Sequence, residues 1–282
     1  MLSQNQKTQA QVIDAIKSAS LLMFDVDGTL AKRQQPISPD LAIDLARTDK
    51  RLGVATSRAN SELDEVFDGS NFTRSLLMQG PIILEDGGLI VYPGEVTPRL
   101  MVTPEEHQAV SQLMELVLAN LTEIGASKWQ RLGDIIDPLV HVPCYYDYQV
   151  SASIWQEVKD GIPRNLERVM GWCLKAVSEL NLSGLLDLTE IGDGTLRISV
   201  PGRSKGVALI ELDSEGIIDL QSTAYFGDGR NDLPAAKAVR EKGGVVIAVD
   251  QQCQELLELA NFVTEERGPD AIRQLIHAAG LV

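Results

Sequence analysis

The sequence predicts an α/β protein, with a Rossmann-like parallel-sheet core into which an α+β unit is inserted. Two features of the chain indicate this fold class. Short apolar runs near both ends stop at polar loops and lead into helical patterns, which is typical of a parallel sheet covered by helices. The middle of the chain instead carries two long amphipathic helices and a hairpin. We therefore assign residues 1–95 and 200–282 to the core and residues 96–199 to the inserted unit.

Continuous apolar runs bounded by turn residues indicate the buried strands of the core. Leu21-Leu22-Met23-Phe24, for example, ends abruptly at an acidic loop. The other elements expected in the N-terminal part are a helix over residues 6–18, strands over residues 52–55 and 81–84, and a helix from about residue 61. The C-terminal part repeats the alternation. We expect strands there over residues 223–226, 244–249 and 262–264, and helices from about residue 233 and over residues 254–260 and 270–279.

The inserted unit begins with a helix start signal. Thr103-Pro104-Glu105-Glu106 is a capping box with proline at the first helical position. The other elements expected in this unit are a helix over residues 164–182, a strand over residues 139–150, and a hairpin of residues 185–191 and 195–200 around Gly192-Asp193-Gly194. Two helices over an antiparallel sheet form an α+β unit.

The composition favours a globular protein and argues against large polyanions as partners. Forty acidic against 25 basic side chains give a net charge of −15, which repels the phosphate backbone of nucleic acids. No apolar stretch is long enough to span a bilayer, and no secretory signal is apparent. We therefore expect a cytoplasmic protein with neither nucleic acid nor membrane as a partner. No pattern in the sequence assigns an oligomeric state.

Polar residues follow the predicted core strands where each strand ends. The residues at these strand ends and at the start of the helix after the insertion are Asp25, Asp27, Thr56, Lys205, Asp228 and Asp232. Because the carboxyl ends of parallel strands form one edge of a sheet, we expect these side chains to share a cleft. Four carboxylates in one cleft repel each other unless a cation lies among them. With oxygen ligands alone, Mg²⁺ is the expected ion.

This set of residue types suits phosphoryl transfer. Asp25, at the tip of its strand, is placed to attack phosphorus, and Asp27 is placed to protonate the leaving oxygen. Thr56 offers a hydroxyl donor, and Lys205 offers a compact cation for the phosphoryl group. The two carboxylates after the C-terminal strand are left to complete the metal site.

The motifs resemble those of the haloacid dehalogenase-like (HAD) phosphatases. Residues 25–29 are identical to the DxDGT first motif of that family, and residues 227–232 match its GDxxND fourth motif. Thr56 matches the second motif, and Lys205-Gly206 matches the third. An α+β insertion between the second and third motifs resembles the type IIB cap of Cof-type, sucrose-phosphate and mannosyl-3-phosphoglycerate phosphatases.

The resemblance implies a mechanism in which Asp25 forms an aspartyl-phosphate. Asp27 would protonate the leaving alcohol and then activate water. The resemblance assigns Mg²⁺ to Asp25, Asp27 (through its main-chain carbonyl), Asp228 and Asp232, and the phosphate group to Thr56, Lys205 and Asn231. One departure concerns the second motif, where the family's common TGR is Thr56-Ser57-Arg58. Either Thr56 or Ser57 is then the hydroxyl of that motif.

We therefore expect a Mg²⁺-dependent phosphatase that acts on a small phosphorylated metabolite, such as a sugar phosphate. A phosphomannomutase-like sugar mutase is an alternative, because that family shares the type II cap. A non-catalytic phosphosugar-binding protein is a second alternative. We expect such a protein to lack one of the four carboxylates, whereas this chain keeps all of them.

Overall fold

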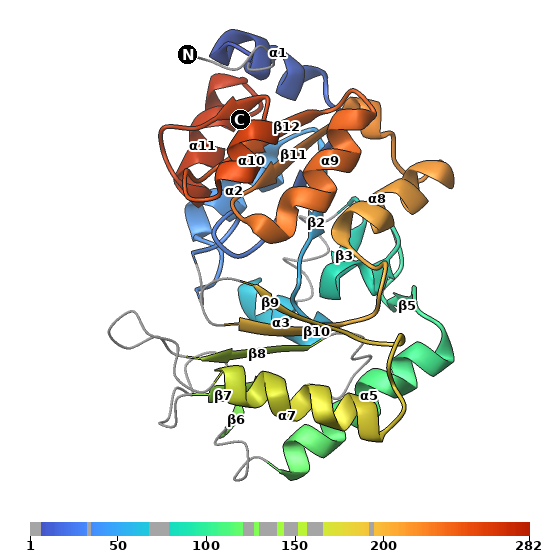
Figure 1. Ribbon diagram of the computed structural model, residues 1–282. Helices are drawn as coiled ribbons and strands as arrows, with labels where there is room; N and C mark the ends of the chain where they lie inside the picture. The colour runs from blue at the N-terminus through green and yellow to red at the C-terminus, as the bar shows by residue number, and fades with distance from the viewer. Residues whose placement is uncertain are drawn as a thin grey trace. The chain divides into compact units, whose positions relative to one another are not determined.

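The computed structural model describes residues 7–32, 35–67, 79–120, 127–129, 140–143, 152–156, 166–191 and 195–282. The chain forms two compact units, one of Met1–Arg99 with Ser204–Val282 and the other of Leu100–Arg203. The first unit contains a mostly parallel sheet with helices, and the second has an α+β arrangement (Figure 1). The predicted fold class is confirmed.

Within the described residues, an eight-stranded sheet of order β13-β12-β11-β1-β2-β3-β4-β5 forms the core of the first unit. Its strands are β1 (Leu21–Phe24), β2 (Arg51–Ala55), β3 (Ile82–Leu84), β4 (Leu89–Val91), β5 (Arg99–Leu100), β11 (Thr223–Gly227), β12 (Val245–Ala248) and β13 (Phe262–Val263). β1 runs parallel to β11 on one side and to β2 on the other. β4 runs antiparallel to β3. The carboxyl ends of β1, β2 and β11 therefore lie at the same edge of the sheet.

Helices surround this sheet and bury its central strands. They are α1 (Gln9–Ser18), α2 (Pro39–Arg47), α3 (Asn60–Val66), α8 (Lys205–Ser214), α9 (Leu233–Glu241), α10 (Gln254–Leu259) and α11 (Gly268–Ala278), with short 3-10 turns η1 (Glu85–Gly87), η2 (Leu220–Ser222) and η3 (Arg230–Asp232). Every residue of β1 is buried, which is why its sequence is uniformly apolar. Phe24 of β1 stacks on Phe226 of β11, with ring centroids 4.8 Å apart.

The second unit has a sheet of order β6-β7-β8-β10-β9 in its described part. Its elements are β6 (Ser127–Trp129), β7 (Val140–Pro143), β8 (Ala152–Gln156), β9 (Asp187–Ile191), β10 (Thr195–Ser199), α5 (Pro104–Ala119) and α7 (Leu166–Glu179). β8 and β9 flank β10 and run antiparallel to it. Leu113 of α5, Val169 of α7 and Leu196 of β10 belong to one buried cluster, so both helices pack on the same face of this sheet.

Several elements differ from the sequence-based expectation. Helix α2 and strands β4, β5, β6 and β8 were not predicted. Helix α2 has a local start signal, because the Ser38 hydroxyl accepts from the N–H of Leu41 and a proline occupies the first turn. The strand expected over residues 139–150 is the shorter β7, and residues 144–150 lie outside the described part. β9 and β10 pair as expected, while their turn at residues 192–194 also lies outside it.

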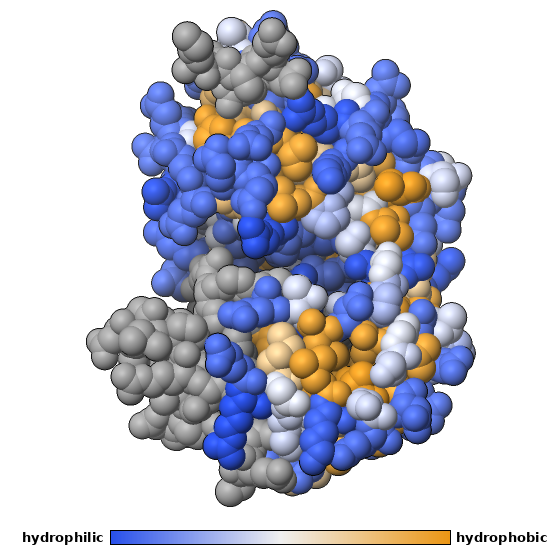
Figure 2. Space-filling model, in the orientation of Figure 1, coloured by the Kyte–Doolittle hydropathy of each residue, from blue (hydrophilic) through white to orange (hydrophobic). Residues whose placement is uncertain are grey.

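The visible surface is mostly hydrophilic, with apolar residues showing in patches on both units (Figure 2). Leu174 of α7, for example, is 53% exposed. No described helix combines the length and the apolar character that a bilayer crossing needs.

Candidate active site

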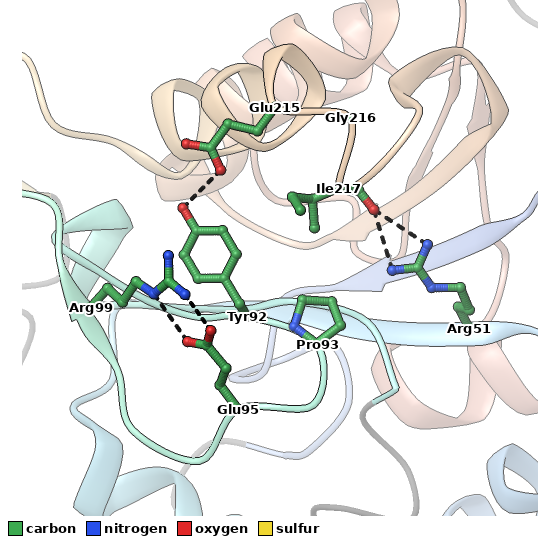
Figure 3. A pocket seen from close by; sticks show the side chains of 8 residues that line it. All are labelled: Arg51, Tyr92, Pro93, Glu95, Arg99, Glu215, Gly216 and Ile217. Carbon is green, nitrogen blue, oxygen red and sulfur yellow. Dashed lines mark hydrogen bonds and ion pairs between the residues drawn. The ribbon is translucent and has the colours of Figure 1, made fainter.

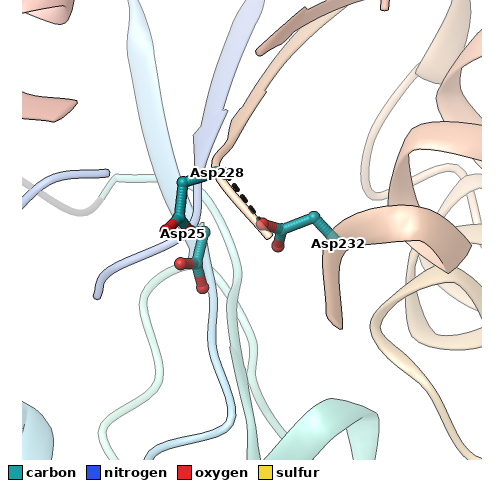
Figure 4. A group of neighbouring side chains, drawn as sticks. All are labelled: Asp25, Asp228 and Asp232. Atoms are coloured by element: carbon teal, nitrogen blue, oxygen red, sulfur yellow. Dashed lines mark hydrogen bonds between the residues drawn. The ribbon is translucent and has the colours of Figure 1, made fainter. Parts of the chain in front are cut away.

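Three carboxylates lie together at the carboxyl edge of the core sheet (Figure 4). Asp25 follows β1, Asp228 follows β11, and Asp232 ends the turn η3. One carboxylate oxygen from each residue lies within 4.8 Å of the other two. The neighbouring parallel strands thus bring together residues that are more than two hundred positions apart, as the sequence pattern predicted.

The loop that carries Asp25 folds tightly because of Gly28. Its N–H donates to the Ala31 carbonyl at 2.7 Å, and its φ of +86° lies in the left-handed region. A Cβ built at this position would overlap the carboxylate of Asp228. Glycine therefore allows the backbone of the first loop to approach a side chain of the loop after β11.

Lys205 bridges two of the carboxylates. It is the first residue of α8, and its side chain is fully buried. Its Nζ donates to Asp25 Oδ1 at 2.6 Å and to Asp232 Oδ1 at 2.7 Å. Burial alone would lower the pKa of Lys205, but the charges of Asp232 and Asp25 outweigh it and raise that pKa above its usual value. The bridge is therefore an ammonium group between two acids.

Four hydrogen-bond donors enclose the carboxylate of Asp232. Its Oδ1 accepts from Lys205 Nζ and from the Tyr225 hydroxyl, both at 2.7 Å. Its Oδ2 accepts from the N–H groups of Asp228 at 3.0 Å and of Gly229 at 3.1 Å. Burial, followed by the charge of Asp232, raises the pKa of Tyr225 well above its ordinary value. The phenol is therefore a protonated donor to Asp232.

The surroundings of Asp25 call for a further cation. Burial, and then the charge of Asp232, raises the pKa of Asp25 well above its ordinary value, although Lys205 acts in the opposite direction. A carboxylate must be ionised to attack phosphorus, so the site needs more positive charge than Lys205 supplies. Oxygen atoms of Asp25 and Asp228 are ligands that suit a hard divalent cation. The donor set fits the predicted Mg²⁺.

Strand β2 delivers the second motif to the same edge of the sheet. Thr56 is buried, its N–H donates to the Ile83 carbonyl at 2.9 Å, and its hydroxyl accepts from the N–H of Arg58 at 3.1 Å. Ser57, the other candidate for this role, is half-buried. Asn231 is also half-buried, in η3.

Asp27 pairs with Arg58, a residue for which no role was predicted from the sequence. Arg58 Nε donates to Asp27 Oδ2 at 2.6 Å, and its Nη2 donates to Asp27 Oδ1 at 2.7 Å. The Arg58 side chain is 9% exposed and that of Asp27 is 33% exposed. Two parallel bonds to one planar group fix both the position and the plane of the carboxylate.

A hollow of about 530 Å³ lies in the first unit near the amino end of β2, at the edge of the sheet opposite to the three carboxylates (Figure 3). It is lined by Arg51, Tyr92, Pro93, Glu95, Arg99, Glu215, Gly216 and Ile217. The Tyr92 hydroxyl donates to Glu215 at 3.0 Å, and Arg99 pairs with Glu95 while lying 4.4 Å from the centroid of the Tyr92 ring. Both of its acids, Glu95 and Glu215, thus have partners within the hollow.

Residues 165–276 match the model of the haloacid dehalogenase-like hydrolase family. The matched segment includes the predicted site residues Lys205, Asp228, Asn231 and Asp232. This part of the chain is similar to the haloacid dehalogenase-like hydrolases.

Solved structures share the fold of this chain over nearly its whole length. The C-terminal domain of trehalose-6-phosphate phosphatase from C. albicans is 13% identical, with 98% of this chain and 99% of that chain covered and a TM-score of 0.66. A sugar phosphatase of HAD subclass IIB is 18% identical, with 93% and 100% covered and a TM-score of 0.57. A HAD phosphatase from Bacteroides thetaiotaomicron is 18% identical, with 94% and 97% covered and a TM-score of 0.56. These likenesses confirm the predicted fold, and with the family match over residues 165–276 they bear out the predicted resemblance to HAD phosphatases.

Two residues of the hydrolase that touch the site were missed from the sequence. Arg58 had a local signal, since it stands two positions after Thr56 in the second motif. Tyr225 had none, because an aromatic residue inside an apolar strand reads as core. Its hydroxyl finds a partner, Asp232, only in the folded protein, where η3 lies against the end of β11.

Proposed function

We propose that this hydrolase is a Mg²⁺-dependent phosphatase that removes the phosphate group of a small phosphorylated metabolite through an aspartyl-phosphate on Asp25. The observation that carries the proposal is the buried contact of Lys205 Nζ with Asp25 Oδ1 at 2.6 Å. An ammonium group beside a carboxylate at a strand end offers a phosphoryl group both a nucleophile and a counter-charge.

The reaction has two displacements at phosphorus. In the first, an oxygen of Asp25 attacks, the P–O bond to the alcohol breaks, and the leaving oxygen takes a proton from Asp27. In the second, water attacks the same phosphorus and gives a proton to Asp27, while the P–O bond to Asp25 breaks. Phosphate leaves, and both carboxyl groups return to their starting state.

Mg²⁺ would be held by Asp25, Asp228 and the main-chain carbonyl of Asp27, and the family resemblance adds Asp232 to this set. When bound, the ion offsets negative charge on the phosphoryl oxygens and on the acids around it. Lys205 supplies the second positive charge at the phosphoryl group. The hydroxyl of Thr56 or Ser57 and the amide of Asn231 are the proposed neutral donors to it.

Arg58 is the proposed positioning residue for Asp27. The acid–base group of this mechanism serves two steps, so it must face the leaving oxygen and then the attacking water from one place. The bidentate contact holds the Asp27 carboxylate in a defined plane in the loop after β1.

A sugar phosphate is the substrate class that we propose. Support comes from the trehalose-6-phosphate phosphatase and the subclass IIB sugar phosphatase whose folds this chain shares. The net charge of −15 is compatible with a small anionic substrate, because a bound divalent cation inverts the local field.

Phosphate release from a panel of sugar phosphates, glycosylated phosphoglycerates and p-nitrophenyl phosphate tests the proposal. We expect release with Mg²⁺, none in EDTA, and a phosphorylated Asp25 in peptides from enzyme quenched during turnover. A mutase would need a bisphosphorylated activator and would release little free phosphate, and a binding protein would release none. Either result would overturn the proposal.

A further inference from the structure

We infer that Tyr225 and Asp232 form an orienting pair for Lys205, and that Asp232 supplies charge to the site without binding the metal directly. The inference rests on the proposed function, in which the Lys205 ammonium group serves the transferring phosphoryl group. It changes the role of Asp232, which the family resemblance places among the metal ligands. It also gives a role to Tyr225, which is otherwise a core residue of β11.

The first argument is the number of acceptor positions on Asp232. A carboxylate has about four lone-pair sites. Lys205 and Tyr225 occupy one oxygen, and the N–H groups of Asp228 and Gly229 occupy the other. A direct bond to a metal would have to displace one of these four donors.

The second argument is the position of Tyr225. It lies in β11, between β12 and β1, and it is 0% exposed. A tyrosine has few rotatable bonds, so a phenol anchored in a central strand is a rigid donor. Its hydroxyl approaches the same oxygen of Asp232 that accepts from Lys205. The tyrosine therefore limits where that oxygen, and the ammonium group bound to it, can lie.

The third argument is what happens to Lys205 during turnover. In the resting site its ammonium group has two carboxylate partners, Asp25 and Asp232. When Asp25 becomes an acyl phosphate it loses its negative charge, and Asp232 remains as the carboxylate that holds Lys205. A fixed Asp232 therefore keeps the ammonium group beside the phosphoryl oxygens after Asp25 has lost its charge.

Tyr225→Phe tests the inference, with Tyr92→Phe as a matched control. Both substitutions remove one hydroxyl that donates to a carboxylate, but Tyr92 and its acceptor Glu215 lie in the hollow at the other edge of the sheet. For Tyr225→Phe we expect kcat to fall roughly three- to tenfold with little change in KM, since a hydrogen bond to a charged group is lost. Tyr92→Phe should keep the wild-type kcat.

Metal binding supplies a readout that does not depend on turnover. Mn²⁺ binding, followed by electron paramagnetic resonance, should be unchanged within twofold in Tyr225→Phe and at least tenfold weaker in Asp228→Asn, a rough expectation for loss of a charged ligand. If Tyr225→Phe weakens Mn²⁺ binding as Asp228→Asn does, Tyr225 acts on a metal ligand and the inference is wrong. It is also wrong if the wild type is active and Tyr225→Phe matches it in kcat. A wild type that releases no phosphate from any substrate contradicts the proposed function instead.

Discussion

Arg58 holds Asp27 by two parallel hydrogen bonds, with Nε 2.6 Å from one carboxylate oxygen and Nη2 2.7 Å from the other. The two residues come from different loops, after β1 and β2, and are 31 positions apart. This geometry matches the planar fork of a guanidinium to the planar fork of a carboxylate. It links the second motif of the hydrolase to the residue that we propose as the acid and base.

We predict that Arg58→Ala lowers kcat by roughly ten- to a hundredfold. The upper value equals the smallest contribution usually made by a positioned proton donor. Arg58→Lys should be impaired as well, because an ammonium group cannot make the bidentate contact. The loss should be smaller for p-nitrophenyl phosphate than for a sugar phosphate, since a good leaving group needs less protonation. Steady-state kinetics with both substrates measures the difference.

Arg51→Ala is the control for Arg58→Ala. Arg51 is a half-buried arginine at the start of β2, and its side chain donates to the Ile217 carbonyl at the other edge of the sheet. Its removal should leave kcat unchanged. In addition, the double variant Arg58→Ala with Asp27→Asn should be no slower than Asp27→Asn alone. Additive losses would show that Arg58 acts independently of Asp27.

We predict that Asp25→Asn abolishes turnover without unfolding the protein. The amide cannot attack phosphorus, so phosphate release should fall below a few per cent of the wild-type rate. Because the folded protein disfavours the charged form of Asp25, the neutral amide should not lower the melting temperature in EDTA. Phosphate release and thermal melting measure the two effects. Retained activity would remove the covalent step from the mechanism.

The raised pKa of Asp25 predicts a pH-dependent stability in the metal-free protein. Between the ordinary carboxyl pKa of about 4 and the raised value, the folded state holds a proton that the unfolded state has lost. The contribution of Asp25 to the free energy of unfolding is therefore greatest below about pH 4 and falls as pH rises through the raised pKa. In EDTA, the melting temperature of Asp25→Asn relative to wild type should increase with pH.

Mg²⁺ should reverse that difference. The ion binds the folded wild type and stabilises it, while Asp25→Asn lacks a proposed ligand. Two other buried or partly buried acids have lowered pKa values, Asp44 through Arg273 and Asp213 through the backbone N–H of Leu220. They change the free energy of unfolding with pH in the opposite direction to Asp25, and they do so equally in both proteins. Comparing the two proteins cancels their effect. A melting difference that is independent of both pH and Mg²⁺ would contradict the prediction.

We predict that Gly28→Ala weakens Mg²⁺ binding at least tenfold, because the new methyl group would displace the Asp228 carboxylate. Gly94→Ala is the control. Gly94 has φ +83°, close to the +86° of Gly28, but among the described residues no atom beyond its two chain neighbours lies within 4 Å of a Cβ built there. Both variants should lose about 1–2 kcal/mol of unfolding free energy from the left-handed backbone. Only Gly28→Ala should lose metal affinity and activity, as measured by calorimetric titration and phosphate release.

The local pattern of the sequence was sufficient to locate most of the core strands. β1, β2 and β11 lie within one residue of the expected ranges, because a fully buried strand must be apolar along its whole length. β4 was missed because a three-residue strand after a turn has too few positions for a period to appear. β8 was missed within a stretch where the sequence offered no clear strand boundary.

The sequence by itself also determined which residue types stand at the strand ends, and hence the chemistry that they can perform. Only the tertiary structure decided their partners. Asp27 with Arg58 and Tyr225 with Asp232 are pairs that depend on which strands are neighbours and how the loops fold between them. Spacing along the chain fixes the face and the end of a strand on which a side chain lies. The hydrogen-bond partner of that side chain depends on atoms from other segments of the chain. Lys205, for example, donates to Asp25, which lies 180 positions before it in the sequence.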